Sequence, residues 1–378
     1  MKPDSSNYLD IFLNDSPLLD VRAPVEFVKG AFPTSTNIPL LDDDQRAEVG
    51  TEYKKNGQDA AIELGWRLAS PEVKSQRQRD WLKYIEQNPQ GYLHCARGGK
   101  RSQLSQQLIR EAGGDYPLVE GGFKKLRNFL LAELEKRSAT LPLMLISGST
   151  CSGKTILVKK LSQALDLEGM ANHRGSVFGR TLVPQPTQIS FENALSIAVL
   201  KHTEKNIKLK AETPLFVEDE GRLIGRVAIP DCFRLRMQSS NLIVVLCALE
   251  KRVEIAFKDY VEDAYPQYLK AYGEEEGFKQ FREQLLGSIS RIKKRLGSER
   301  YYVISQLFDE ALSQFGSLIS ADKFRSAIRL LLEEYYDPMY DYQRKQRAGR
   351  VVFEGDQSSV MEWISENALE NSNNNYIH

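Results

Sequence analysis

The chain has 378 residues, enough for two domains, and its 41% hydrophobic and 27% charged residues are ordinary for a globular protein. Its 51 basic and 51 acidic residues cancel, so the whole chain is no polycation and a nucleic-acid site would have to be a local patch. The four cysteines form no CxxC pair, which favours a reducing cytoplasm, and the longest apolar run, 242–249, is too short to cross a bilayer.

The N-terminal region contains short extended pieces joined by turns. A strand is expected from Ser16 to Val21, and it leads into the segment DVRAPVEF (20–27). The segment GAFPTSTNIP (30–39) then places glycine and proline at turns, which on physical grounds lie at the surface around one buried Asp–Arg pair. Residues 42–88 follow and read as mostly helical, so we expect an inserted helical cap.

The stretch GYLHCARGGKRSQ (91–103) has the pattern of a strand, a tight loop and a helix opening at Ser102. Loop N–H groups, a helix N-terminus and nearby cations suit the centre of such a loop to an anion. Cys95 is the nucleophile there, and a thiol in this positive field reacts as a thiolate. The competing interpretation is a small apolar core cysteine at a strand end. The residues expected to form the site are Cys95, Arg97, Gly98, Gly99 and Arg101.

Two families share features of this N-terminal part. The segments DVRAPVEF, GAFPTSTNIP and the Cys95 loop, in this order, resemble the rhodanese domain, a small α/β fold whose loop cysteine carries persulfide sulfur. The segment 119–122 resembles the last strand and turn of that domain. The spacing His94-Cys95, five residues, Arg101-Ser102 is also the signature of cysteine-dependent phosphatases, in which the arginine binds phosphate bidentately. A sulfurtransferase loop is usually one residue tighter, so both chemistries remain open at this loop.

A second anion-binding loop is expected where a new domain begins. Leu141–Ile146 reads as a buried strand, the segment GSTCSGKT (148–155) follows, and a helix with apolar periodicity comes next. This is G-x4-G-K-T in the strand, loop and helix context of a P-loop. Its N–H groups would hold a di- or triphosphate, its lysine would neutralise charge and its threonine could bind Mg²⁺, while ATP binding stays open. The residues expected at this site are Gly148, Ser152, Gly153, Lys154 and Thr155.

The segment LFVEDE (215–220) is an apolar strand that ends in carboxylates, as a Walker B strand does. One of these acids would hold the metal or orient a group at the phosphate, and the alternative is that they cap a strand end at the surface. The candidate acids are Glu218, Asp219 and Glu220. A further buried strand is expected at 242–249, and the alternation of strands with helices predicts a parallel sheet wrapped by helices.

Three segments outside these loops contain arginine, histidine or aromatic side chains that could contact a substrate. The segment 169–180 holds two glycine turns, a histidine, arginines and a phenylalanine, which together could bind phosphate and stack a base. The segments 220–225 and 333–340 are also candidates for substrate binding, although the tyrosines of 333–340 fit a core as well as a stacking platform. The residues considered for RNA or substrate binding here are His173, Arg174, Ser176, Phe178, Arg222, Tyr335 and Tyr336.

The predicted fold class is α/β with two domains. Residues 1–137 are assigned to a rhodanese-like domain with a helical insertion at about 42–88. Residues 138–368 are assigned to a P-loop NTPase-like domain with a parallel sheet, and its C-terminal extension is helical because the chain after Arg252 reads mainly as helix. The polar tail 369–378 is predicted to be disordered.

Five segments in one order, CARGGKRS, GSTCSGKT, HRGSVFG, EDEGRLIG and EEYYDPMY, resemble the bacterial tRNA 2-selenouridine synthase family over nearly the whole chain. The resemblance implies a transferase that replaces sulfur by selenium in 2-thiouridine at the tRNA wobble position. It implies selenophosphate as the selenium donor and an S-geranylated uridine made from geranyl diphosphate. We therefore expect a cytoplasmic enzyme that uses Mg²⁺. Its expected partners are the anticodon loop of tRNA and a selenophosphate-producing enzyme. Gly65 falls at a position that the family holds as glycine.

The two loops allow this chemistry to be divided. An alkylated sulfur leaves more readily than a thiocarbonyl sulfur, so prenylation before selenium attack splits one hard displacement into two easier ones. In this hypothesis the P-loop holds the diphosphate of geranyl diphosphate, and Lys154 with Mg²⁺ stabilises the departing diphosphate. Cys95 would carry selenium as a perselenide beside Arg101, with Arg97 free to face the RNA. The alternatives are a cysteine-dependent phosphatase linked to a nucleotide-binding domain, and a rhodanese-type sulfurtransferase acting on RNA.

Overall fold

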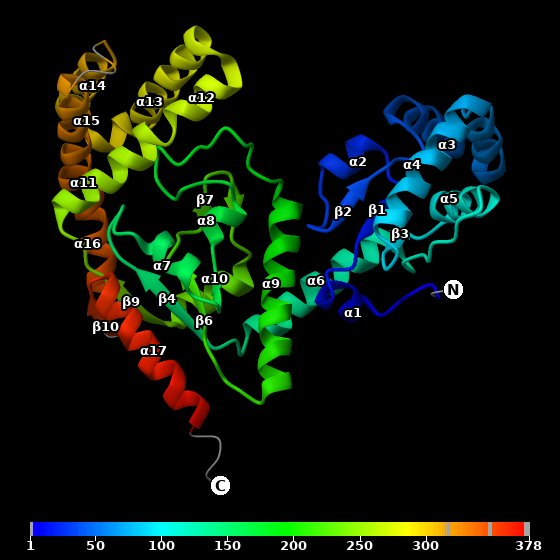
Figure 1. The fold of residues 1–378 in the computed structure, drawn as a ribbon, viewed down its shortest axis with the longest axis horizontal. Helices are drawn as coiled ribbons and strands as arrows, with labels where there is room; N and C mark the ends of the chain where they lie inside the picture. Colours follow the sequence, from blue (N-terminus) through cyan, green and yellow to red (C-terminus); the bar gives the residue numbers. More distant parts are fainter. Residues whose placement is uncertain (1–2, 314, 316–317, 347–349, 374–378) are drawn as a thin grey trace. The chain divides into compact units, whose positions relative to one another are not determined.

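The computed structural model describes residues 3–313, 315, 318–346 and 350–373 (Figure 1). Contacts between residues divide the chain into two compact units. The first unit comprises residues 1–137 and 187–204, and the second comprises residues 138–186 and 205–378. No helix among the described residues is long and apolar enough to span a membrane.

The first unit is built on a small parallel sheet with strand order β2-β1-β3. Its strands are β1 (Leu18–Asp20), β2 (Ser35–Asn37) and β3 (Tyr92–His94), and a single parallel bridge from Leu93 to Leu118 extends the sheet. The helices around it are α1 (Tyr8–Leu13), α2 (Pro24–Val28), α5 (Lys100–Glu111) and α6 (Gly122–Ser138). Strand β1 is buried along its whole length, as expected for the middle strand of a covered parallel sheet.

A buried ion pair organises the turns that follow β1. The guanidinium of Arg22 binds the Asp20 carboxylate at 2.6 Å, donates to the carbonyl of Gly30 at 2.8 Å and lies 3.8 Å from the centroid of the Phe123 ring. The Asn37 side chain donates to the carbonyls of Asp20 and Arg22, both at 2.8 Å. The buried Asp–Arg pair expected from the sequence is therefore confirmed, and it ties together the two N-terminal turn segments.

The region 42–88 is helical, as predicted. Helix α3 (Asp43–Leu68) has non-helical backbone angles at Gly57 (φ 85°, ψ −171°), so it consists of two arms joined by a kink. The arms meet again at their far ends, where the Gln45 side chain donates to the carbonyl of Leu68 at 3.3 Å. Helix α4 (Pro71–Gln87) is anchored by Trp81, whose buried indole donates to the carbonyl of Ile38 at 2.9 Å. Both helices therefore pack on the same unit as the Cys95 loop.

Helix α9 (Gln188–Leu209) belongs to the first unit up to residue 204, whereas the sequence placed it inside the P-loop domain. Asn193 on this helix donates to the carbonyl of Ala31 at 2.9 Å and accepts from Arg127 at 3.0 Å. An added Cβ at Gly30 would lie 2.2 Å from Ile189, so only glycine allows this close approach. A segment distant in sequence thus completes the first unit, which local patterns do not reveal.

The second unit contains a five-stranded sheet with order β10-β9-β4-β6-β5, in which every pairing is parallel. The strands are β4 (Leu143–Ser147), β5 (Ala164–Leu165), β6 (Leu215–Glu218), β9 (Asn241–Val245) and β10 (Val351–Gly355). The predicted parallel sheet is confirmed, and β10 is an edge strand that the sequence did not predict. An antiparallel hairpin of β7 (Leu223–Ile224) and β8 (Val227–Ala228) stands apart from this sheet.

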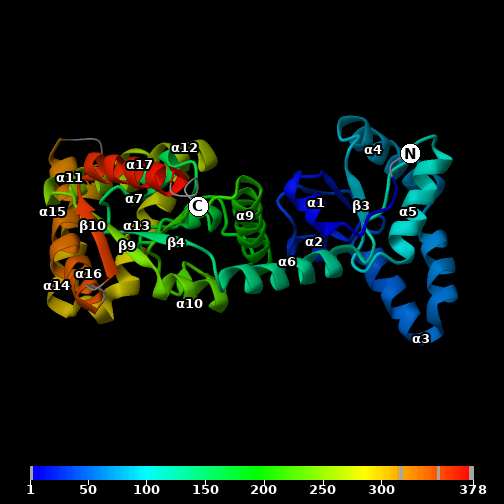
Figure 2. The same ribbon diagram turned by 90° about the horizontal axis from the view of Figure 1, so that it is seen from below.

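Helices cover both faces of the five-stranded sheet (Figure 2). Helix α7 (Lys154–Lys160) and α17 (Gln357–Asn373) pack on one face through the cluster that contains Leu157, Ile243 and Val360, and α10 (Asp231–Ser239) lies on the other. Val360 and Ile364, one turn apart on α17, are buried against the sheet, and the helix continues to Asn373. Residues 369–373, predicted to be disordered, are thus helical, and the rest of that predicted tail, 374–378, lies outside the described residues.

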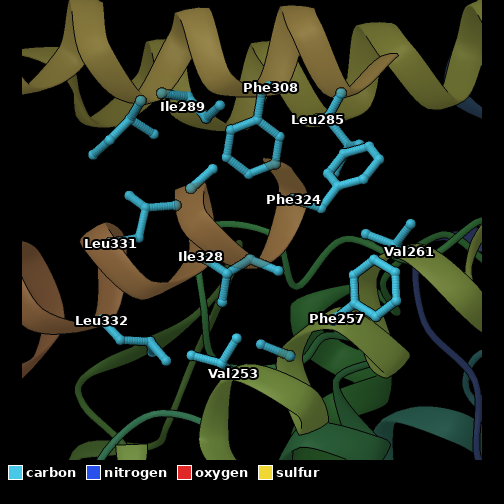
Figure 3. Packing of buried hydrophobic residues seen from close by; sticks show 14 of the residues in the cluster. Val253, Phe257, Val261, Leu285, Ile289, Phe308, Phe324, Ile328, Leu331 and Leu332 are labelled. Carbon is cyan, nitrogen blue, oxygen red and sulfur yellow. The ribbon is translucent and has the colours of Figure 1, made fainter. Parts of the chain in front are cut away.

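A helical layer follows β9 in the chain. It contains α11 (Leu249–Phe257), α12 (Tyr265–Tyr272), α13 (Glu274–Leu296), α14 (Ser298–Ser313), α15 (Leu318–Leu331) and α16 (Asp337–Gln346). Figure 3 shows the core between them, in which residues such as Leu285, Ile289, Phe308, Phe324 and Ile328 meet. Two single π-helical turns, η1 (Lys258–Glu262) and η2 (Leu332–Tyr336), interrupt the α-helices.

Candidate active site

The Cys95 loop lies between β3 and α5, and its thiol faces the first turn of that helix. Gly99 is the residue before the helix, so α5 begins at Lys100, two residues earlier than predicted. The Cys95 Sγ is 3.2 Å from the hydroxyl of Ser102, which in turn donates to the carbonyl of Gly99 at 2.9 Å. Cys95 is 3% exposed, and Arg97 beside it is exposed.

The backbone of this loop presents unused donors. Among the described residues, no N–H group from Ala96 to Arg101 has a hydrogen-bond acceptor. The carbonyls of Cys95 and Ala96 instead accept from the N–H groups of Phe123 and Lys124, at 2.9 and 3.0 Å. Consecutive free N–H groups at a helix N-terminus form a binding site for an anion, so the structure supports the anion-binding interpretation of the loop.

Close backbone packing explains the first glycine of the loop. Gly98 has a φ of +64°, and a Cβ there would lie 2.6 Å from the backbone nitrogen of Gly121. Gly122 has a φ of +57°, and a Cβ there would lie 2.3 Å from the carbonyl oxygen of Cys95. The turn that the sequence placed after a last strand therefore supports the cysteine loop from behind, and any side chain at either position would push the two apart.

Arg101 is held by a carboxylate that the sequence did not identify as part of the site. Its guanidinium binds Glu26 through two hydrogen bonds of 2.5 and 3.1 Å. Burial lowers the pKa of Arg101, but the hydrogen bond and charge of Glu26 outweigh it and raise the pKa. Burial likewise opposes ionisation of Glu26, yet the hydrogen bond from Arg101 keeps its pKa below the usual value. The pair orients Arg101 at the edge of the loop.

His94 packs beneath the loop and does not face the thiol. It is fully buried, its Nδ1 lies 3.3 Å from the carbonyl of Cys95, and its Nε2 lies 3.8 Å from the Asp20 carboxylate. Burial lowers the pKa of His94, so the ring is neutral at physiological pH. The histidine of the His-Cys signature is therefore a structural support in this protein.

A cavity of about 870 Å³ opens beside Cys95. The Cys95 loop and α5 form one side, and both arms of α3 form the other. Gly65 lines the cavity, and a Cβ added there would meet only Val49 at 3.9 Å, so its backbone needs no close approach. Glu26 is the one carboxylate lining the cavity among the described residues, and it is ionised through its pairing with Arg101. The general acid that a phosphatase would need is thus missing from this lining.

The P-loop of the second unit has the predicted strand, loop and helix arrangement. Strand β4 leads into the loop, and Lys154 begins α7 after Gly153, whose φ is +84°. The Lys154 Nζ donates to the carbonyls of Gly148 and Ser149, at 2.8 and 3.1 Å, and the Ser152 hydroxyl is buried with no partner among the described residues. Burial lowers the pKa of Lys154, but surrounding anionic groups raise it overall, so the amine is charged. These groups suit a phosphate-bearing ligand.

Strand β6 brings the predicted acids beside this loop, because β6 pairs with β4 and aligns Ile146 with Glu218. Glu218 is fully buried, and its Oε1 has no hydrogen-bond partner among the described residues. Asp219 accepts from the hydroxyl of Ser147 at 2.8 Å. Glu218 is therefore buried beside the P-loop and does not cap a strand end at the surface, whereas Asp219 and Glu220 are half-buried.

Glu168 is a further acid of this cluster, and sequence reasoning missed it. Its carboxylate accepts from the Thr155 hydroxyl at 3.2 Å and from the N–H of Gly175 at 2.6 Å. Its own N–H donates to Glu218 at 3.2 Å. The residue stands on the short helix α8 (Leu167–Met170), which follows β5 at the same sheet edge. Its position could have been predicted, because the carboxyl ends of parallel strands lie at one edge of a sheet and Glu168 follows such a strand.

No group of three or more His, Cys, Asp or Glu side chains arranged to hold a metal ion occurs in the part of the chain that the structure describes. The residues present nevertheless fit a magnesium ion bound in the manner of P-loop proteins, through the Thr155 hydroxyl and the phosphates of a ligand. Buried Glu218, with its unpaired oxygen, and Glu168 lie beside that hydroxyl. The carboxylates would then act through water or by orienting Thr155.

Glu218 makes folding of the ligand-free protein depend on pH. Burial, followed by the charge of Glu168, raises the pKa of Glu218 from 4.5 to about 7. A carboxyl group that keeps its proton more tightly when folded stabilises the fold at low pH, and this contribution is lost as the pH rises from 4.5 through about 7. We expect thermal unfolding to show about 1–3 kcal/mol less stability at pH 8 than at pH 5 from this group.

Replacing Glu218 by glutamine should remove that part of the pH dependence. The matched control is Glu283→Gln on α13, an exposed glutamate away from the P-loop, which should unfold with the slope of the unmodified protein. The comparison is made by thermal unfolding of all three proteins between pH 5 and pH 8. Identical slopes for the unmodified protein and Glu218→Gln would show that Glu218 is not the group responsible.

The glycine-rich segment 173–179 folds next to the P-loop cluster. Gly175 binds Glu168, the Ser176 hydroxyl is 2.8 Å from the Tyr260 hydroxyl, and the N–H of Val177 donates to the Tyr336 hydroxyl at 3.1 Å. The structure thus brings together two of the segments that the sequence marked for substrate binding. Tyr336 is buried, so it positions this segment and does not offer a stacking surface.

The other residues considered for RNA or substrate binding are in varied surroundings. Arg174 donates to the carbonyl of Asp259 at 2.7 Å, and His173 is buried with Nδ1 unpartnered among the described residues. The Phe178 ring packs against Phe308, with centroids 5.8 Å apart, as part of the helical core. Tyr335 packs against the same core, and Arg222 is exposed before β7. A core role accounts for both aromatic rings, and the exposed Arg222 stays a candidate for RNA contact.

The late segment 333–340 also fixes the P-loop itself. Asp337 binds the guanidinium of Arg252 through hydrogen bonds of 2.6 and 3.0 Å. The same guanidinium donates to the carbonyl of Thr150 at 2.9 Å, inside the P-loop. From the far end of the chain, the Gln357 amide donates to the carbonyl of Gly153 at 2.9 Å. Residues about 200 positions apart in the chain therefore define the shape of this loop.

Comparison with known proteins gives one consistent family. Residues 141–371 match the family model described as the tRNA 2-selenouridine synthase AAA domain. The chain is similar to the tRNA 2-selenouridine synthase of Marinobacter nauticus, with 48% identity over 362 residues, covering 96% of this chain and 97% of that protein. It is similar to the proteins of the same name from Shewanella halifaxensis, with 45% identity over 96% of this chain and 98% of that one, and from Hahella chejuensis, with 46% identity over 96% and 94%.

Proposed function

The chain belongs to the tRNA 2-selenouridine synthase family, and we propose that its two anion-binding loops carry out two successive steps on one uridine of tRNA. In the first step the second unit, which contains the P-loop and is called the P-loop unit below, geranylates 2-thiouridine at the wobble position with geranyl diphosphate. In the second step the first unit, which contains Cys95 and is called the Cys95 unit below, replaces the S-geranyl group by selenium from selenophosphate. The observation that supports this division most is that each unit holds its own loop suited to an anion. One has N–H groups without acceptors beside Cys95, and the other has Lys154 and the buried, unpartnered Ser152 hydroxyl.

The P-loop suits the first step because the leaving group is a diphosphate. The thiouridine sulfur attacks C1 of the geranyl group, the C1–O bond breaks, and the N3 proton is released as the S–C1 bond forms. Lys154 and the loop N–H groups would bind the departing diphosphate, whose charge grows during this step. Mg²⁺ held by Thr155 would supply further charge neutralisation. No ATP is needed for this reaction.

The Cys95 loop suits the second step when Cys95 attacks phosphorus. A perselenide, the form expected from the sequence, would need an oxidant, because selenium in selenophosphate already has the oxidation level found in 2-selenouridine. Instead, selenium displaces geranyl thiol at C2 while still bonded to phosphorus. The Cys95 thiolate then forms an S–P bond as the P–Se bond breaks and N3 takes up a proton. Water hydrolyses the S–P bond and releases phosphate.

Several features of the first unit support phosphoryl binding by this loop. The N–H groups from Ala96 to Arg101 have no acceptor among the described residues, and Arg101 carries full charge at the loop edge. The spacing of His94-Cys95 and Arg101-Ser102 is that of loops that hold a phosphate. In this proposal the first unit is rhodanese-like in fold, with a loop one residue longer. The exposed Arg97 would contact the anticodon loop of a cytoplasmic tRNA. A selenophosphate-producing enzyme is the partner that would supply the donor.

The alternatives are less well supported. An independent phosphatase would need a protonated acid near Cys95, and the carboxylate lining the cavity is ionised Glu26. A sulfurtransferase acting on RNA would use the same thiol, but its reaction would require neither the P-loop nor the acids beside it. The family to which the chain belongs favours selenium over sulfur.

Reconstitution with purified protein tests the proposal. The substrate is an anticodon stem-loop RNA with 2-thiouridine at the wobble position, supplied with geranyl diphosphate, Mg²⁺ and selenophosphate, and the nucleosides are analysed by mass spectrometry. We expect S-geranyl-2-thiouridine to appear first and 2-selenouridine to follow. Omission of geranyl diphosphate should prevent both products. Formation of 2-selenouridine without geranyl diphosphate would reject the two-step route while leaving the synthase activity itself in place.

A further inference from the structure

The cavity beside Cys95 is larger than a phosphate-binding loop requires. Its volume of about 870 Å³ falls within the range of pockets that enclose whole organic ligands. A phosphoryl group on Cys95 would occupy the space among the loop N–H groups and leave most of this volume unused. The helical arms of α3 enclose that remaining volume, which indicates that they hold another part of the substrate.

Part of the cavity lining is apolar. Both arms of α3, the turn before it and α5 contribute to it, through Leu41, Val49, Ala61, Ile62, Trp66 and Leu104. Trp66 is 40% exposed, although tryptophan is usually more deeply buried. Leu41, Val49 and Leu104 also pack in a hydrophobic cluster of this unit. Ile62 and Trp66 lie outside that cluster, so they are the apolar side chains that a ligand in the cavity would cover.

Basic side chains lie around the same cavity. The lining includes Arg46, Lys54, Arg77 and Lys100 in addition to the arginines of the Cys95 loop. Glu26 is the single lining carboxylate among the described residues. An apolar interior with a cationic surround is complementary to a ligand that joins a hydrocarbon chain to a polyanion, such as a prenylated nucleotide within RNA.

We propose that this cavity binds the geranyl chain of S-geranyl-2-thiouridine, and that α3 is the wall that recognises it. The inference rests on the two-step function proposed above and names the substrate that the Cys95 unit selects. With the chain in the cavity, the sulfur that carries it and the neighbouring C2 atom lie close to Cys95. The geranyl group then anchors the nucleotide for the second step, and its departure as geranyl thiol weakens the hold on the product.

Selection for the alkylated base follows from apolar burial. Each buried methylene group contributes about a fourfold gain in affinity, so a ten-carbon chain outweighs a methyl group even when partly buried. The Cys95 unit would therefore bind 2-thiouridine that has not yet been geranylated only weakly. Free geranyl diphosphate is the competing occupant, since it also joins a hydrocarbon to an anion, but its diphosphate is assigned to the P-loop.

The test measures binding of chemically made RNA to the full chain, without turnover. Anticodon stem-loops that carry S-geranyl- or S-methyl-2-thiouridine at the wobble position are titrated, and Trp66 provides a fluorescence signal that Trp66→Phe identifies. We expect the geranylated RNA to bind at least about 10-fold more tightly. Ile62→Asp should abolish this preference. Val28→Asp, at a 71% exposed position of the same unit outside the cavity, should preserve it.

The binding measurements distinguish a cavity that binds the geranylated nucleotide from a cavity that binds geranyl diphosphate. Equal affinity for the two RNAs, or a preference that survives Ile62→Asp in a protein whose circular dichroism is unchanged, would overturn the proposal. A loss of geranyl diphosphate binding in Ile62→Asp with retention in Lys154→Ala would also overturn it, because the cavity would then serve the donor. Ile62→Ala gives a milder change should the charged variant unfold, and we expect an intermediate preference. The reconstitution described above tests the two-step route independently of these affinities.

Discussion

Replacing Cys95 by alanine should abolish formation of 2-selenouridine and leave geranylation intact. In the proposed function the Cys95 thiol is the nucleophile of the first unit. It lies 3.2 Å from the Ser102 hydroxyl, and the N–H groups of Ala96–Arg101 have no acceptor among the described residues. Loss of a nucleophile commonly lowers a rate by a factor on the order of 10³ or more. Geranylation is assigned to the second unit in the proposed function, so it should proceed at the rate of the unmodified protein. Nucleoside analysis of the reconstituted RNA measures both steps.

The control for this variant is Cys232→Ala, a half-buried free cysteine on α10. It removes a thiol of the same size and should leave both steps unchanged. In the Cys95→Ala protein, S-geranyl-2-thiouridine or its phosphorylated selenium derivative should accumulate. Loss of geranylation together with selenium incorporation would contradict the assignment of the two steps to separate sites.

Replacing Lys154 by alanine should impair geranylation and leave the selenium exchange intact. Lys154 is the half-buried cation of the P-loop, and its amine donates to loop carbonyls that a diphosphate ligand would replace. Removing a preorganised charge from a developing anion typically costs about 100-fold or more in rate. We expect geranyl diphosphate binding and geranylation to fall accordingly, while selenium exchange on RNA that is already geranylated continues. Equilibrium binding of geranyl diphosphate and the two separate half-reactions measure these effects.

Lys159→Ala is the matched control, because Lys159 stands on the same helix with its side chain 65% exposed. Removing it lowers the net charge of the unit by the same amount without touching the loop. Undiminished binding of geranyl diphosphate by Lys154→Ala would remove the P-loop from the first step. Equal losses in both variants would indicate a general charge effect in place of a specific contact.

The central parts of both loops could be predicted from the sequence because local patterns determine them. A buried strand followed by glycines and a helix has few conformations available, and both Gly98 and Gly153 adopt the positive φ that such loops need. The carboxylates after β6 were also predictable, since parallel strands place their carboxyl ends at one edge of the sheet. The structure confirms the parallel sheet and the position of Glu218 beside the P-loop.

The remaining site residues depend on contacts between distant segments, which no local pattern encodes. Glu26 reaches Arg101 across 75 positions, and Arg252 reaches Asp337 across 85. Glu168 stands on a helix too short to produce a periodic signal. The cavity beside Cys95 exists because α3 kinks at Gly57 and folds back on itself, whereas the sequence shows only a long helical stretch.

The two π-helical turns set a constraint on chain length. Tyr260 and Tyr336 stand in η1 and η2, and their hydroxyls hold Ser176 and Val177 in the glycine-rich segment. Each π-helical turn contains one residue more than an α-helical turn, so deleting a single residue would rotate everything beyond it by about 100°. Both tyrosines would then leave the glycine-rich segment. The helices between residues 249 and 336 can therefore exchange many surface side chains, but they cannot gain or lose one residue at these turns.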